Sequence, residues 1–206
     1  MLGAPLDALR PAASFNASHV AAALLALLLW SPDAAAKDWH RALDQGEIVV
    51  YTTAVKGSDV PATVVKAVIN TAPERVWRLV SHCGDYPRTM LRIKAGTEVS
   101  RKGNDIVCRV TVDMPFPYSD LTATTRVVHQ VGGGRWSRRW TLMHGDYTAN
   151  SGAWLLRRFG GDGNRTLVLY SAHAVPKAWV PGWVRDRAQK KTLPEMITKL
   201  RKLLGV

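Results

Sequence analysis

The sequence predicts an α+β fold in which a curved antiparallel sheet is followed by a long C-terminal helix. Glycine-containing turns at residues 102–105, 132–134 and 160–164 join runs rich in β-branched residues, which is typical of an antiparallel meander. Near the C-terminus the apolar residues change to a helical period and form one face, made of Leu193, Met196, Ile197, Leu200, Leu203 and Leu204.

The size and composition indicate one folded domain with an extension. The chain has 206 residues, against a typical domain of about 150 residues. Apolar residues make up 47% and charged residues 21%, which excludes a globally disordered chain. Two cysteines are too few for a disulfide-rich scaffold or a four-cysteine zinc site. Eight tryptophans indicate large amphipathic surfaces, in a core, a cavity or a membrane-facing rim.

Residues 1–36 have the pattern of a secretory signal peptide. Val20 to Trp30 is an uncharged apolar run of 11 residues, too short to span a bilayer core of about 30 Å. Three alanines, residues 34–36, then offer a small-residue cleavage site before Lys37. We expect export to the periplasm with cleavage of this leader; the alternative is that the leader is retained as an anchor.

The first part of the mature chain predicts two strands and a helix. Residues 38–45 are a short helical or irregular segment, and residues 47–53 and 63–70 are strands separated by a break at 57–61. Thr71-Ala-Pro-Glu74 matches a capping box with Thr71 as N-cap, and the helix it starts ends near Gly84. We therefore divide the chain into a leader (1–36), an N-terminal extension with the first strand (37–62) and the main domain (63–206).

The rest of the domain predicts a meander and a broken helix. Its expected strands are residues 95–101, 106–113, 121–131, 136–143, 150–159 and 166–175. Pro176 and Pro181 bracket an exposed loop. Pro194 lies inside the last helical span, which predicts a kink there or two abutting helices.

Alternation along three strands predicts which side chains face inward. The inward sets are Ile106, Cys108, Val110 and Val112; Leu121, Ala123, Thr125, Val127 and His129; and Trp136, Arg138, Trp140 and Leu142. Along the last two strands, alternation does not show which side chains face inward. Arg138 is a charge among aromatic residues, and burying it alone costs several kcal/mol. It is either a paired structural residue or a partner for the polar head of a ligand.

No pattern of catalytic or metal-binding residues is present. His82, His129, His144 and His173 have no carboxylate or second histidine at ligand spacing. There is also no G-x-S-x-G nucleophile motif. We therefore expect no metal, no cofactor and no catalytic residue. Cys83 and Cys108 form either a disulfide or two buried thiols, depending on a register that the sequence does not fix.

Four stretches of sequence carry a resemblance to a known family. They are Asn70 to Trp77, Gly84-Asp85-Tyr86-Pro87, the hairpin from Gly145 to Trp154, and Pro176 to Pro181 followed by Leu193-Pro194-Glu195-Met196. In this order and spacing they resemble the START-like (SRPBCC, Bet v 1-like) superfamily, in the bacterial branch similar to coenzyme-Q-binding and polyketide cyclase/dehydrase proteins. The resemblance covers about residues 63–204. It implies a helix-grip fold with an apolar cavity between sheet and helix, and no shared catalytic set.

A protein of this kind is expected to bind a hydrophobic ligand in that cavity. The ligand class is a lipid, a sterol or hopanoid, or an isoprenoid quinone, which we expect the protein to bind as a monomer. The sequence leaves open whether it also transports the ligand. The expected cavity wall comprises Val110, Val127, Trp136, Arg138, Trp140, Leu193, Met196 and Ile197. The alternative is a cyclase/dehydratase-type enzyme acting on a polyketide-like substrate, with proton chemistry at His129 or Tyr170.

The net charge of +12 raises a second question, the partner of the basic surface. No nucleic-acid recognition motif is present, so we expect no nucleic-acid partner. Trp179 and Trp183 stand beside Arg185 and Arg187, a combination suited to an anionic membrane surface. The alternatives are a plain solvated basic face and tryptophans that pack inward to seal the core.

Overall fold

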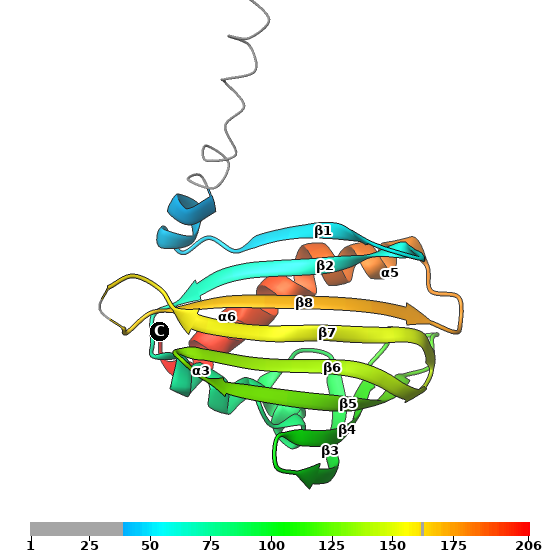
Figure 1. Ribbon diagram of the computed structural model, residues 1–206. Helices are drawn as coiled ribbons and strands as arrows, with labels where there is room; N and C mark the ends of the chain where they lie inside the picture. Colours follow the sequence, from blue (N-terminus) through cyan, green and yellow to red (C-terminus); the bar gives the residue numbers. More distant parts are fainter. Residues whose placement is uncertain (1–38, 162) are drawn as a thin grey trace, which may run out of the picture. The chain divides into compact units, whose positions relative to one another are not determined.

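A single curved antiparallel sheet is the main element of the computed structural model, which describes residues 39–161 and 163–206 (Figure 1). The expected leader lies outside the described residues. The strands follow the spatial order β1-β2-β8-β7-β6-β5-β4-β3. Their bounds are Val49–Val55 (β1), Ser58–Ile69 (β2), Ile93–Lys102 (β3), Asp105–Val112 (β4), Leu121–Gly132 (β5), Arg135–Gly145 (β6), Tyr147–Arg158 (β7) and Thr166–Pro176 (β8).

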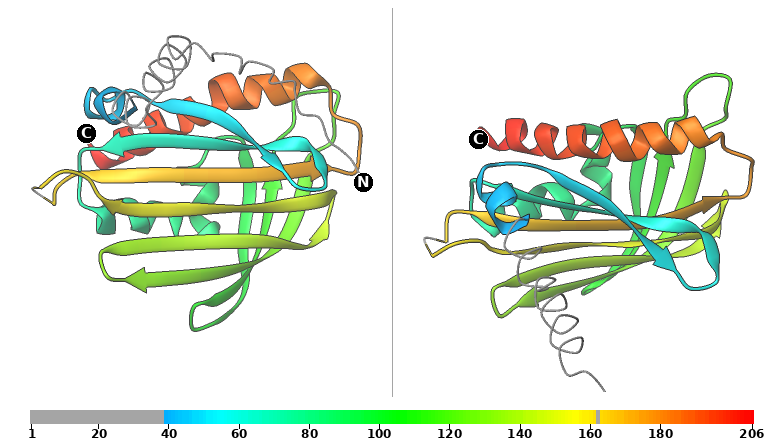
Figure 2. Two further views of the ribbon diagram at one scale, coloured as in Figure 1. Left: turned by 45° about the horizontal axis from the view of Figure 1, so that its top comes forward. Right: turned by 90° about the horizontal axis from the view of Figure 1, so that it is seen from above.

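The helices lie in two groups. Between β2 and β3 the chain forms α3 (Pro73–Val80), a short 3₁₀ turn η1 (Cys83–Asp85) and α4 (Tyr86–Thr89). After β8 it forms α5 (Gly182–Arg187), a π-helical segment η2 (Ala188–Thr192) and α6 (Leu193–Leu204). The segment from α5 to α6 runs along one face of the curved sheet (Figure 2). The predicted α+β helix-grip architecture is therefore confirmed.

Most strands lie within a few residues of their predicted bounds, and β2 differs most. It begins at Ser58 and includes Pro61, where the sequence predicted a break. Pro61 lies outside the stretch of β2 that pairs with β8, residues 63–69, and next to an irregularity in the β1–β2 register. A proline, which lacks an N–H, is tolerated at such a position.

The predicted capping box at the start of α3 is wrong. The N-cap is Ala72, and no side chain caps the helix, while Pro73 occupies the first turn as expected. The hydroxyl of Thr71 instead accepts a hydrogen bond from Arg75 Nη1 at 3.1 Å. The carboxylate of Glu74 pairs with Arg158 at 3.2 Å. Arg75, one turn further along α3, and Arg158 of β7 therefore bind the two side chains that the capping box would use.

The sheet is apolar on both faces at β2 and β8. Val65, Ala67 and Val168 belong to the main core beneath α6. On the opposite face Val68 and Leu167 pack with Leu43 and Phe159 in a second cluster. Leu43 lies in a helical segment, residues 39–44, that precedes β1. This second layer explains why alternation declared no face for β8.

Hydrogen bonds of three side chains, those of Lys199, Arg201 and Arg75, fix α6 to the domain. Lys199 Nζ donates to the carbonyl of Met90 at 2.7 Å, and Arg201 Nη2 donates to the carbonyl of Val68 at 2.7 Å. Arg75 Nη2 donates to the carbonyl of Leu204 at 3.1 Å. Pro194 lies in the first turn of α6, where a missing N–H leaves no intrahelical bond unmade. The two abutting helices expected from Pro194 are thus α5 and α6, joined by η2.

Candidate functional site

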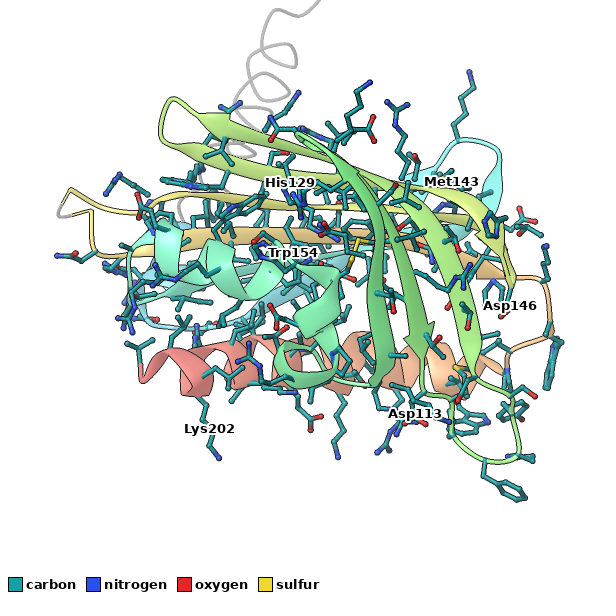
Figure 3. All side chains as sticks on the ribbon, turned by 90° about the horizontal axis from the view of Figure 1, so that it is seen from below. Asp113, His129, Met143, Asp146, Trp154 and Lys202 are labelled. Atoms are coloured by element: carbon teal, nitrogen blue, oxygen red, sulfur yellow. A yellow bond between two sulfur atoms is a disulfide. The ribbon has the colours of Figure 1, made fainter. Side chains whose placement is uncertain are left out.

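A cavity of about 630 Å³ lies between the sheet and the helices, within the range of small-molecule binding sites. Its walls are mostly apolar. The sheet contributes Val110, Val112, Ala123, Val127, Trp140, Trp154 and Tyr170, and the helices and the residues next to them contribute Met90, Leu91, Leu193 and Met196. In Figure 3, Trp154 lies between the sheet and the helices, whereas Lys202 points away from α6. The enclosed space is therefore suited to an apolar molecule.

Six of the eight residues expected on the cavity wall line it: Val110, Val127, Arg138, Trp140, Leu193 and Met196. The other two, Trp136 and Ile197, do not line it; they are buried in the main core. Trp136 precedes Arg138 on β6 by two residues and shares its face. Alternation predicts which face of a strand a side chain lies on, but not how far along the strand the cavity extends. On β6 the cavity ends near Arg138.

Two residues that the sequence did not reveal as part of the site hold Trp140 in place. Trp140 Nε1 donates to Asn150 Oδ1 at 2.9 Å. A Cβ atom at Gly152 would lie 2.3 Å from the Trp140 ring, so only glycine leaves room for the indole. Both residues belong to the hairpin stretch that carried the family resemblance. The spacing Asn150, Gly152, Trp154 therefore shapes one wall of the cavity.

A disulfide joins the region after α3 to the sheet. Cys83 in η1 is bonded to Cys108 in β4, which resolves the alternatives that the sequence left open. The backbone at Cys83 also comes very close to Gly96 of β3. A Cβ atom at Gly96 would lie 2.0 Å from the carbonyl oxygen of Cys83, so only glycine fits there. The disulfide forms part of the inner cavity wall, where Cys108 is a lining residue.

Arg138 is the one strongly charged group at the inner end of the described cavity. It is only 2% exposed. Its Nη1 donates to the carbonyl of Ser81 at 2.9 Å and contacts His129 Nε2 at 2.8 Å, and its Nη2 donates to Cys108 Sγ at 3.3 Å. Its guanidinium carbon lies 5.4 Å from the ring centre of Tyr86. Among residues 39–161 and 163–206, no carboxylate forms a salt bridge with it.

Burial keeps three titratable groups at or next to the cavity, His129, Tyr170 and Tyr147, in their neutral forms. Burial and the nearby Arg138 lower the pKa of His129 to about 4. Burial raises the pKa of Tyr170 well above its usual value. Burial also raises the pKa of Tyr147 to about 12, with a contribution from Asp146. At neutral pH, Arg138 is therefore a cation whose hydrogen-bond partners are uncharged. The carboxylate of Glu98, which binds Arg101, interacts with it electrostatically without forming a salt bridge.

The cavity opens beside α5 and the loop between β4 and β5. Trp183 and Arg187 of α5 line it, as do Met114 and Pro115 of the loop. Asp113, labelled in Figure 3, also lines it at the end of the loop next to β4. The ring of Tyr118 lies 6.5 Å from that of Trp183, which brings the two segments together.

Exposed aromatic residues surround this opening. Trp183 is 55% exposed, Trp179 78% and Phe116, in the same loop as Met114, 96%. Arg187 is exposed, and the side chain of Arg185 lies outside the described part. Neither tryptophan packs inward to seal the core. In the described residues, no helix is long and apolar enough to cross a membrane, and no cluster of side chains could hold a metal ion.

Comparison with protein families matches residues 69–201 to the family described as polyketide cyclase / dehydrase and lipid transport. The chain belongs to this family. The match begins inside β2, so β1 and most of β2 lie before it although both strands are part of the sheet. Comparison with curated protein sequences finds no significant match.

Solved structures with the fold of this polyketide cyclase and lipid transport family include both classes of its name. A STAR-related lipid transfer protein from Xanthomonas axonopodis has 18% identity and a TM-score of 0.65 over 77% of this chain and 94% of its own. Human StAR-related lipid transfer protein 5 has 13% identity and a TM-score of 0.67 over 76% and 81%. The ZhuI aromatase/cyclase from Streptomyces has 14% identity and a TM-score of 0.52 over 76% and 93%.

Proposed function

We propose that this protein binds a hydrophobic ligand of the lipid class in the cavity between the sheet and α6, and carries it as a monomer. The observation that carries the proposal is the largely apolar wall around a space of about 630 Å³. Such a void would be costly if it stayed empty, since its lining atoms lack packing partners. A bound apolar molecule restores those contacts.

Two features favour binding over the cyclase or dehydratase alternative. An enzyme of that kind needs a group that exchanges a proton near neutral pH. Tyr170 lines the cavity, but burial raises its pKa far from neutrality. The imidazole of His129 is engaged by Arg138, and its pKa is lowered to about 4. Neither candidate from the sequence is therefore poised as a general acid or base.

We further propose that the opening docks on an anionic membrane to exchange ligand. Phe116, Trp179 and Trp183 offer aromatic rings that can insert at the level of the headgroups. Arg187, Lys190 and Lys191 are exposed in the same helical segment and can meet lipid phosphates. The leader pattern of residues 1–36 supports a periplasmic location for this exchange. A protein from the envelope fraction that still begins at Met1 would remove the cleaved-leader part of the proposal.

The binding proposal is tested by identifying what the purified full chain carries. Native mass spectrometry followed by solvent extraction should show a bound lipid-like molecule. Val110→Trp fills the cavity from β4 and should reduce the bound fraction severalfold. Arg109→Trp is the matched control, because Arg109 is exposed on the other face of the same strand. If both variants carry as much ligand as the parent, or the parent takes up no apolar molecule, the cavity is not the binding site.

A further inference from the structure

Arg138 is a buried cation that forms no salt bridge with any carboxylate of the described residues, although Glu98 interacts with it at longer range. Its partners are a backbone carbonyl, a neutral imidazole, a disulfide sulfur and Tyr86. A buried charge normally has a partner of opposite sign, because isolating it from water is expensive. Since Arg138 lines the cavity, the space beside it is where such a partner can lie. We propose that the ligand is an anionic amphiphile whose carboxylate binds Arg138.

The hydrogen bonds of the guanidinium show which edge is left for a ligand. Arginine has five N–H donors in a fixed planar arrangement. The two on Nη1 are directed to Ser81 and His129, and one on Nη2 is directed to Cys108 Sγ, a weak acceptor. The Tyr86 hydroxyl also interacts with the guanidinium. The N–H of Nε and the second N–H of Nη2 are not used in the bonds to Ser81, His129 and Cys108 and can bind a further acceptor. These two nitrogens share the edge on which a carboxylate forms two parallel hydrogen bonds.

One arginine matches one negative charge, and this favours a carboxylate over a phosphate monoester. A terminal phosphate carries about −1.5 to −2 charges at neutral pH and offers more acceptor oxygens than one guanidinium satisfies. No second cation lines the inner end of the described cavity; Arg92 and Arg187 line it as exposed residues. His129 stays neutral there, since its pKa is lowered to about 4.

The position of Arg138 also sets the direction of the ligand. Arg138 is almost fully buried, whereas Trp183, at the opening, is more than half exposed. Between them the walls are apolar and include Val110, Trp140 and Met196. A carboxylate at Arg138 therefore places the hydrocarbon chain along these walls, with its far end toward the opening.

This inference rests on the proposed function, and the test separates the two. The delipidated full chain is titrated calorimetrically at neutral pH with dodecanoic acid, dodecan-1-ol and dodecyl phosphate, which share one chain. We expect the acid to bind about ten- to a hundredfold more tightly than the alcohol, the advantage typical of a charge-assisted hydrogen-bonded pair. If none of the three binds, the proposed function fails. If acid and alcohol bind equally, that function stands and the carboxylate site is wrong.

Variants locate the preference on the residue. Arg138→Met keeps the length of the side chain without its charge and should lose the advantage of the acid while still binding the alcohol. Arg138→Lys keeps the charge without the planar fork and should retain part of the advantage. Arg139→Met, next to it on the exposed side of β6, should bind like the parent. If Arg138→Met does not fold, the parent comparison of acid and alcohol decides. Tighter binding of dodecyl phosphate than of the acid would overturn the carboxylate assignment.

Discussion

Arg138 and His129 lie directly opposite each other on β6 and β5, and Arg138 Nη1 lies 2.8 Å from His129 Nε2. The guanidinium can only donate, so Nε2 accepts and the imidazole carries its proton on Nδ1. The edge-on ring of Trp77, 4.9 Å away, helps to enclose the histidine. The neutral state of His129 is therefore a condition for holding Arg138 at the inner end of the cavity.

The first prediction concerns pH. The pKa of His129 is lowered to about 4 in the folded protein, against the usual 6.5 of a histidine. Between these values the unfolded chain binds a proton that the folded chain does not, so stability falls as the pH drops from about 6.5 to 4. This contribution is complete above pH 6.5 and is about 3 kcal/mol.

The measurement is the free energy of urea unfolding across this pH range. His129→Gln keeps a hydrogen-bond acceptor for Arg138 and removes the titration, so its stability should depend less on pH than that of the parent. Carboxylates that titrate in the same range affect both proteins alike and cancel in the difference. Parallel curves for the two proteins would contradict the buried neutral histidine.

The second prediction concerns the disulfide between Cys83 and Cys108, which are separated by 25 residues. Closing a loop of this length lowers the entropy of the unfolded chain and is worth about 3 kcal/mol. The double variant Cys83→Ser, Cys108→Ser should lose about that much in denaturant unfolding. Reducing agent should lower the unfolding free energy of the parent by a similar amount and leave that of the double variant unchanged. A parent whose stability does not change on reduction would contradict this contribution of the disulfide.

The third prediction separates core from cavity on α6. Ile197 is fully buried and does not line the cavity, whereas its neighbour Met196 does. Ile197→Ala should cost about 2–5 kcal/mol of stability with little effect on ligand affinity. Met196→Ala should cost less stability, because its side chain already borders a void, and should weaken ligand binding. Denaturation and calorimetric titration of both variants check the contrast, which fails if the two behave alike.

The fourth prediction concerns the glycine beneath Trp140. A Cβ at Gly152 would lie 2.2 Å from the carbonyl oxygen of Ser171 and 2.3 Å from the Trp140 ring. Gly152→Ala should therefore displace the indole from its bond to Asn150, destabilise the protein by about 1–3 kcal/mol and reduce ligand binding. Ser151→Ala, on the neighbouring position of β7, is the control. Unchanged tryptophan fluorescence and ligand affinity in Gly152→Ala would show that Trp140 keeps its position despite the added methyl group, and would contradict this prediction.

The fifth prediction concerns the membrane. Binding to vesicles should require anionic lipid and weaken as salt reduces the Debye length from about 10 Å at 0.1 M to about 3 Å at 1 M. Reversing the charges of Arg187, Lys190 and Lys191 should abolish binding, and Trp183→Ser should reduce it. Arg157→Glu is the control, because it reverses a charge on β7, away from α5 and outside this surface. Vesicle sedimentation that ignores both salt and these charges would leave the basic face with no role in docking.

The sequence predicted the sheet well where its two faces differ. On β5 the inward set from Leu121 to His129 is buried as alternation required. On β8 alternation failed because Leu167 and Val168 are both buried, one on each face of the sheet. The layer responsible includes Leu43, which comes from a distant part of the chain. A local period cannot report such a contact.

The sequence predicted which strand face the site residues lie on, but not which residues contact one another. Arg138 was correctly placed inside, yet its partners Ser81, His129 and Cys108 come from different elements, and no spacing along the chain encodes them. Trp136 illustrates the same limit, since it lies on the predicted inward face of β6 but in the core beyond the end of the cavity. The disulfide needed the position of η1 relative to β4, and that position depends on the close approach at Gly96.

The order of strands has a consequence for aggregation. β8 pairs with β2 on one side and β7 on the other, so its backbone is fully protected only while β2 is in place. A chain cut at residue 69, where the family match starts, would leave β8 as a long open edge. Its run Leu167-Val-Leu-Tyr170 is apolar, uncharged and β-prone, the kind of edge on which strands of other molecules add. The hairpin of β1 and β2 thus covers this apolar strand and keeps it from being an edge of the sheet.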